Sequence, residues 1–105
     1  MSSQSPFQPL GKTVAIAVST TPSTPVQVPT GIMSNCYRIY NSTSQACFFV
    51  GGGSSAAVAT SAANGGGHMQ PGNSVEVMRY SPGSWFSAYT PTGTTTLYLT
   101  PGDGV

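Results

Sequence analysis

The chain has 105 residues, the size of a single domain that buries one core without needing a metal or a disulfide framework. Its charged fraction is 5% and its net charge is +1, so the surface must consist largely of hydroxyl, amide and glycine groups. Without a basic cluster to neutralise phosphates, the sequence argues against nucleic acid and against an anionic membrane as partners, and low charge favours self-association or assembly.

Residues 1–11 are predicted to form an extended N-terminal arm, and residues 12–105 a single β-sandwich domain. The arm is rich in Ser, Gln and Pro, with Phe7 and Leu10 as its apolar anchors. It either folds back on its own domain or docks on another subunit. The N-terminus lacks the pattern of a signal peptide, and no apolar run approaches the length of a membrane span. We therefore expect synthesis in a cytosol.

Alternating apolar residues predict several short strands in the first half of the chain. Val14, Ile16 and Val18 share one face of the first strand, which is the face expected to be buried. In a later strand, Tyr37 and Ile39 project to the side opposite Cys36, Arg38 and Tyr40. The strands expected in this half are 14–18, 26–28, 35–40 and 46–50.

The two cysteines lie on strands 35–40 and 46–50, which are expected to form a hairpin through residues 41–45. A two-residue turn would place Cys36 and Cys47 directly opposite each other. A four-residue loop would instead place Cys36 opposite Phe49, too far from Cys47 for a disulfide. The longer loop and a reducing cytosol both predict free thiols.

Residues 51–72 have low complexity, with two glycine triplets bracketing 54–64 and a thin strand expected at 57–60. The segment is interpreted either as a mobile loop or as a place where backbones pass close to a neighbour. A strand follows from Val75 to Tyr80. The sequence Ser-Pro-Gly-Ser at 81–84 predicts a type II turn, at which the chain crosses between sheets.

The last fifth of the chain is expected to be a β-hairpin of 84–89 and 94–99, joined through 90–93 and followed by a turn at 100–104 that ends the last strand. Both faces of this hairpin would be apolar, so one face should pack on the core and the other on a neighbouring element or subunit. The residues proposed to form an interface are Phe7, Leu10, Trp85, Phe86, Tyr89 and Tyr98.

The pattern contains seven to eight short strands and no segment with helical periodicity. Strand spacings near ten residues indicate an all-β protein, an antiparallel β-sandwich or jelly roll. No internal repeat of fixed period is visible, which argues against a solenoid or a propeller.

The sequence offers little chemistry. His68 is the one histidine and is expected to lie exposed in a loop beside Gly67. Glu76 and Asp103 are the two carboxylates, and neither has an acid, base or sugar-binding groove near it in the sequence. The glycine triplets lack the Lys-Ser or Lys-Thr of a phosphate loop. We therefore predict no catalytic residues, no metal, no cofactor, no small-molecule substrate and no enzymatic activity.

Several stretches resemble small all-β virion proteins of tailed bacteriophages. They are the serine-rich start, Pro-Val-Gln-Val-Pro at 25–29, Tyr-Arg-Ile-Tyr-Asn at 37–41, Trp-Phe-Ser-Ala-Tyr at 85–89 and the ending Tyr-Leu-Thr-Pro-Gly-Asp-Gly-Val. The resemblance implies a capsid decoration, or cement, protein that is made in the host bacterial cytoplasm. It would bind the major capsid protein lattice and copies of itself on the outside of the head, and stabilise that head.

Two other functions stay open at this point. The first is a tail or head-tail connector component, which the same resemblance allows. The second belongs to another class, a host-surface carbohydrate-binding module that uses Trp85 and the nearby tyrosines as a stacking platform.

Overall fold

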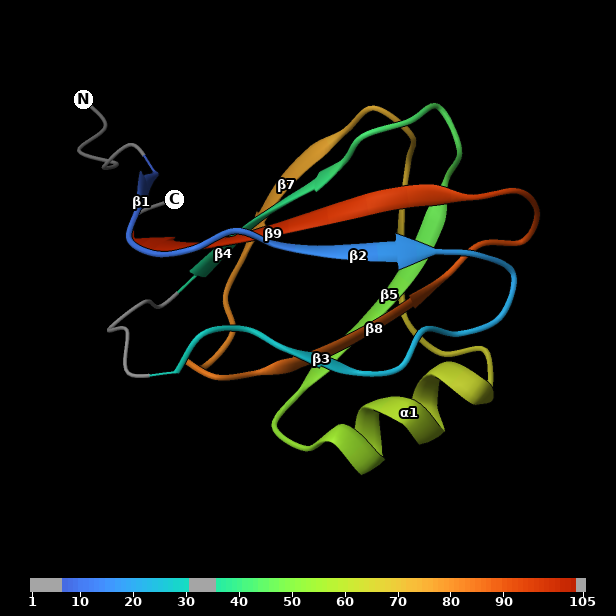
Figure 1. The fold of residues 1–105 in the computed structure, drawn as a ribbon, viewed down its shortest axis with the longest axis horizontal. Helices are drawn as coiled ribbons and strands as arrows, with labels where there is room; N and C mark the ends of the chain where they lie inside the picture. The colour runs from blue at the N-terminus through green and yellow to red at the C-terminus, as the bar shows by residue number, and fades with distance from the viewer. Residues whose placement is uncertain (1–6, 31–35, 104–105) are drawn as a thin grey trace, which may run out of the picture.

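The computed structural model describes residues 7–30 and 36–103, which form two antiparallel sheets packed as a sandwich with one short helix (Figure 1). Sheet A consists of β1 (Gln8–Pro9), β2 (Val14–Val18), β4 (Cys36–Asn41), β7 (Val75–Met78) and β9 (Thr95–Asp103). Sheet B consists of β3 (Val26–Gln27), β5 (Cys47–Gly52), β6 (His68–Gln70) and β8 (Trp85–Tyr89). The predicted antiparallel β-sandwich is confirmed.

Strand β9 is the long strand around which sheet A is arranged. It pairs on one side with β4, and β4 pairs in turn with β7. On its other side it pairs with β1 near its end and with β2 near its start. Sheet B has the order β3-β8-β5-β6. Most connections along the chain therefore cross from one sheet to the other rather than forming hairpins.

The hairpin predicted for the last fifth of the chain is wrong, because β8 lies in sheet B and β9 in sheet A. Residues 90–93 step between the two layers instead. Gly93 adopts φ 75° there, and the Thr90 hydroxyl donates to the Gly93 carbonyl at 3.0 Å. Phe86 consequently does not pair with Tyr98. Its inward side chain packs against the inward residues of the other sheet, so the strand finds its apolar partner across the sandwich.

The core lies between the sheets and contains the inward residues of both. Phe86 is fully buried, with its ring centroid 5.9 Å from that of Tyr37 and 4.8 Å from that of Tyr80 in edge-to-face geometry. The predicted inward face of the first strand is confirmed, since Ile16 and Val18 are buried. The core residues are Ile16, Val18, Val28, Tyr37, Ile39, Cys47, Phe49, Phe86, Ala88, Leu97 and Leu99.

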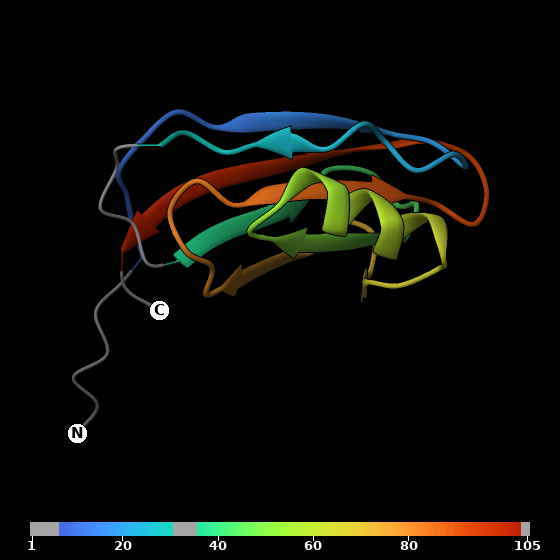
Figure 2. The same cartoon turned by 90° about the horizontal axis from the view of Figure 1, so that it is seen from below.

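A helix, α1 (Ser55–Ala63), replaces the thin strand expected at 57–60. The Ser54 hydroxyl caps it by accepting from the Ala57 amide at 3.2 Å, and its many alanines are good helix formers. Val58 and Ala62, one helical turn apart, are buried. The helix packs on β5 and β8 at the outer face of sheet B (Figure 2). The helix therefore covers one outer face of the sandwich.

The cysteines do not share a hairpin, because β4 and β5 belong to different sheets. Cys36 and Cys47 are both buried thiols and do not form a disulfide. The structure agrees with the prediction that the two cysteines do not pair, the redox state stays a prediction, and the predicted hairpin behind it is wrong. The crossing between sheets predicted at 81–84 is confirmed, and Gly83 has the positive φ, 75°, that a type II turn requires.

Strand β9 runs on through Pro101 and Gly102 to Asp103, where the sequence predicted a terminal turn. Pro101 is tolerated because it lies beside the gap between β1 and β2, and its carbonyl accepts from the Leu10 amide at 2.9 Å. In the described part of the predicted arm, β1 pairs with the end of β9 in the same chain. Residues 1–6 of the arm lie outside the described residues.

Candidate functional site

The six residues predicted to form an interface do not gather on one surface. Phe86 is in the core, whereas Tyr89 stacks on Phe48 with ring centroids 5.4 Å apart and donates its hydroxyl to the Gly66 carbonyl. Trp85 lies on the same side of β8 as Tyr89, because the two residues are four positions apart and side chains alternate along a strand. Tyr98 belongs to the other sheet and is 37% exposed.

The two arm residues lie at the end of β9. The Phe7 ring packs against Gly102, where any side chain would collide with it, and Phe7 is half-buried. Leu10 is 42% exposed, although its backbone amide is bound to Pro101. Phe7 thus contacts its own domain, and Leu10 presents its side chain to solvent.

The outer face of sheet A carries an apolar row that the sequence analysis missed. The register places Val75 opposite Tyr40, Tyr40 opposite Tyr98, and Tyr98 opposite Ala15, so one row crosses β7, β4, β9 and β2. We call these four residues the tyrosine row. Val75 is 47%, Tyr40 39% and Tyr98 37% exposed, and the two tyrosine rings stack with centroids 6.1 Å apart.

The surroundings of the tyrosine row carry little charge. The next row toward the end of β9 places Val77 opposite Arg38 and Arg38 opposite Thr100, whose hydroxyl is hydrogen-bonded to that of Thr13 at 2.8 Å. The row on the other side pairs Thr96 with Ala17. The face is therefore apolar at its centre and hydroxyl-rich around it, a composition suited to a protein contact or a sugar.

Sequence alternation alone could not assemble this row. Alternation places Tyr40 and Ile39 on opposite faces of their strand, but the residues of other strands that lie opposite Tyr40 follow only from the register. The nearest signal was the placement of Arg38 and Tyr40 on one face, which the structure confirms by the exposure of both residues.

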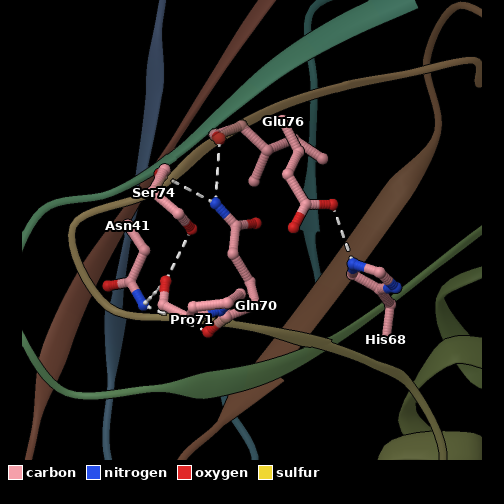
Figure 3. Close-up of polar contacts among 7 residues, drawn as sticks. Asn41, His68, Gln70, Pro71, Ser74 and Glu76 are labelled. Atoms are coloured by element: carbon pink, nitrogen blue, oxygen red, sulfur yellow. Dashed lines mark hydrogen bonds and ion pairs between the residues drawn. The ribbon is translucent and has the colours of Figure 1, made fainter.

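A buried polar cluster connects the crossovers between the sheets (Figure 3). The Asn41 amide nitrogen donates to the carbonyls of Gln45 at 2.8 Å and Pro71 at 3.2 Å, and the Asn41 oxygen accepts from the Thr95 hydroxyl at 2.6 Å. The Gln70 amide nitrogen donates to two further carbonyls at 3.0 Å. Because the partners are mainly backbone carbonyls, this cluster positions loops rather than a substrate.

His68 is exposed, as the sequence predicted, but it is not in a loop. It lies in β6, at the edge of sheet B, and its Nε2 is 2.8 Å from Oε1 of Glu76 in β7, at the edge of sheet A (Figure 3). The pair joins the two sheet edges on one side of the sandwich. Asp103, in contrast, is the last residue of β9 and pairs with Gln8, so the register separates it from Glu76.

The two thiols are poor nucleophiles in the folded chain. Burial raises the pKa of Cys47 to about 11. Burial also raises the pKa of Cys36, with a further increase from Asp103 and an opposing effect of Arg79. Both groups are therefore protonated at neutral pH and shielded from reagents.

Within 7–30 and 36–103, no three His, Cys, Asp or Glu side chains gather in a way that would hold a metal ion. No helix in the same residues has the length and apolar character needed to cross a membrane.

Comparisons with protein-family models, with curated proteins and with solved structures find no match to this chain. The resemblance to small phage virion proteins consequently rests on the sequence patterns themselves. The surface that the structure adds to those patterns is the tyrosine row on the outer face of sheet A.

Proposed function

We propose that the protein is a non-enzymatic structural protein of a bacteriophage virion, which decorates the head by binding the major capsid protein lattice. The observation that carries the proposal is the outer face of sheet A. One outer face of the sandwich is covered by α1, whereas the opposite face exposes Tyr40, Tyr98 and Val75 amid hydroxyl groups. A sandwich with few charges and one largely apolar outer face is suited to lie on a larger protein surface.

The expected affinity per copy is modest, because the exposed apolar row is small. A decoration protein does not need a large interface, since many copies bind one lattice and each bound copy is held at high effective concentration. Truncating an aromatic residue in such an interface costs about 1–2 kcal/mol, which is a loss of about 5- to 30-fold in affinity. The tyrosine row therefore offers a measurable test.

The test is co-sedimentation of the purified protein with tailless heads of the phage that encodes it. We expect saturable binding, and at least a tenfold loss of affinity in the Tyr40→Ser/Tyr98→Ser double variant. Met69→Ser is the matched control, because Met69 is a 49% exposed apolar residue on sheet B, away from this face. Binding to isolated tails but not to heads would favour the connector function instead.

The stacked and exposed rings of Tyr40 and Tyr98 favour a second candidate, a carbohydrate-binding module of the virion. In that case the isolated protein binds host-surface glycans, and the Tyr40→Ser/Tyr98→Ser variant loses this binding while its retention on heads is unchanged. A glycan-binding measurement on the same two proteins separates the candidates.

A further inference from the structure

The sandwich has open sheet edges, and an open edge presents unpaired backbone groups to any other strand. Most of these edges carry features that oppose strand addition. Strands β1 and β3 have two residues each, β1 contains Pro9, and β3 is flanked by Pro25 and Pro29. Such short edges with proline offer little backbone to pair with.

The edges formed by β6 and β7 are protected by charge. Glu76 lies opposite the buried Ile39, so its side chain is on the inward face of edge strand β7, where it meets His68 of edge strand β6. An inward charge at an edge is a common defence against strand addition, because a new strand would bury it.

Strand β2 has none of these protections. It consists of five residues, Val-Ala-Ile-Ala-Val, without charge, proline or glycine, and among the described strands it pairs with β9 alone. Figure 2 shows it as the outermost strand on its side of the sandwich. A segment of this composition at an edge is a site for pairing with another strand.

The backbone of β2 presents Ala15 and Ala17 to the open side. The Pro101 carbonyl accepts from Leu10 on the β2 side of β9, whereas the Thr96 carbonyl accepts from Ser42 on the β4 side. The backbone N–H and C=O groups of odd-numbered β9 residues thus point toward β2. Leu97 lies opposite Ile16, so the backbone groups of Ile16 point toward β9. Because backbone groups alternate in direction along a strand, Ala15 and Ala17 must direct theirs away from β9.

We propose that β2 pairs with β2 of a second copy of this chain, antiparallel and about a two-fold axis at Ile16. The sequence Val-Ala-Ile-Ala-Val is the same when read backwards, so each residue of 14–18 meets an identical or equivalent one. Ala15 lies opposite Ala17 of the second copy and exchanges both backbone hydrogen bonds with it. The interface is isologous, as a two-fold dimer requires.

The alternating direction of the backbone groups and the sequence of β2 are both satisfied by one register. Outward-directed residues must meet outward-directed residues, so only registers centred on a residue, rather than between two residues, are allowed. Among these, the register centred on Ile16 pairs all five residues of β2. It also places Lys12 opposite Thr20 of the second copy, which keeps the two lysines at opposite ends of the interface.

This inference goes beyond the proposed function, because it names a surface through which the chain associates with itself, and it rests on the edge geometry alone. An interface of five residues per copy is smaller than a standard one, so we expect a Kd of about 10–300 µM. Such a dimer forms at the local concentrations of a lattice or an oligomer.

The test is sedimentation of the full chain in solution, without heads, up to about 1 mM. Two double variants distinguish the register, since Ala15 and Ala17 are exposed and their backbone groups face away from β9. Ala15→Lys/Ala17→Lys places like charges opposite each other and should weaken the dimer at least tenfold, whereas Ala15→Lys/Ala17→Glu places opposite charges together and should retain it. Ala56→Lys/Ala59→Lys, at two exposed positions of helix α1, is the control and should dimerise as the parent does.

Cysteine cross-linking checks the same register. A mixture of the Ala15→Cys and Ala17→Cys proteins should form an intermolecular disulfide, and neither protein should do so alone. A parent that stays monomeric at 1 mM overturns the inference, as do equal dimer affinities for the two charge variants. Because Ala15 belongs to the tyrosine row, the lysine variants are compared only in solution and not on heads. A parent that stays monomeric but still binds heads refutes the self-pairing and leaves the proposed function standing.

Discussion

The substitution Asn41→Asp tests most directly whether the buried polar cluster holds the crossovers together. The side chain of Asn41 is fully buried, and its amide nitrogen donates to the carbonyls of Gln45, Pro71 and Gln70 at 2.8, 3.2 and 3.4 Å. Aspartate has nearly the same shape, but it replaces the donor nitrogen with a carboxylate oxygen, which is an acceptor facing three other acceptors. The accepted hydrogen bond from Thr95 is retained, so the change isolates the donor.

The magnitude follows from the geometry. The short contact to Gln45 is a full hydrogen bond, and the two longer contacts are weaker. Losing them costs about 1 kcal/mol of net bonding, and the buried Gln70 carbonyl and the two part-buried carbonyls left unsatisfied add about 1–3 kcal/mol more. With a buried carboxylate facing them, we expect a loss of about 3–5 kcal/mol of unfolding free energy, out of the 5–15 kcal/mol typical of a domain.

Urea unfolding at pH 7 measures this loss. Asn73→Asp is the matched control, because Asn73 is an exposed turn residue with φ 53° at which aspartate is tolerated, and we expect a change within about 0.5 kcal/mol. Burial raises the pKa of a carboxyl introduced at position 41, so the folded state takes up its proton first. The penalty therefore shrinks as the pH falls toward and below about 3.9, the unfolded pKa. Equal losses in the two variants at pH 7 would refute the reasoning.

The end of β9 and the thiols give further predictions. Gly102→Ala must displace the ring of Phe7 and the backbone carbonyl of Gln8, and should cost about 1–3 kcal/mol in urea unfolding, whereas Gly53→Ala has open space and should not; equal effects would mean that neither group packs against Gly102. Because burial raises the Cys47 pKa from 9.0 to about 11, ionisation favours the unfolded chain as pH rises through this range. The unfolding free energy should then fall by up to about 3 kcal/mol more in the parent than in a Cys47→Ala variant between about pH 9 and 11. Alkylation of the unreduced protein should modify Cys36 and Cys47 in denaturant and neither in the native state; a disulfide would block both.

The class of fold was predictable because alternation identifies a half-buried strand locally. The faces of Ile16, Val18, Tyr37 and Ile39 depend on period-two spacing, and the sandwich confirms each of them. The turn at 81–84 was also predictable, since Pro followed by Gly specifies a type II turn and that turn type does not close a tight hairpin. These are short-range signals, and their physical causes lie within a few residues.

The strand pairing was not predictable in the same way. A connector such as 90–93 is long enough either to close a hairpin or to step between layers, and both outcomes bury Phe86. Only the sum of contacts across the sandwich decides between them. The helix was missed for a related reason, because glycine triplets lower helix propensity around 55–63 while the alanines between them raise it, and packing of Val58 on sheet B decides the outcome.

The candidate surfaces depend on the strand pairing, which the sequence did not predict. The tyrosine row combines residues of four strands from four separate parts of the chain, so it exists only once the register of sheet A is fixed. The palindrome at 14–18 is readable in the sequence, but it has no meaning for a strand between two neighbours. It becomes an interface signal only because β2 lies at an edge and presents Ala15 and Ala17 outward, which follows from the pairing of β9 and from nothing within β2 itself.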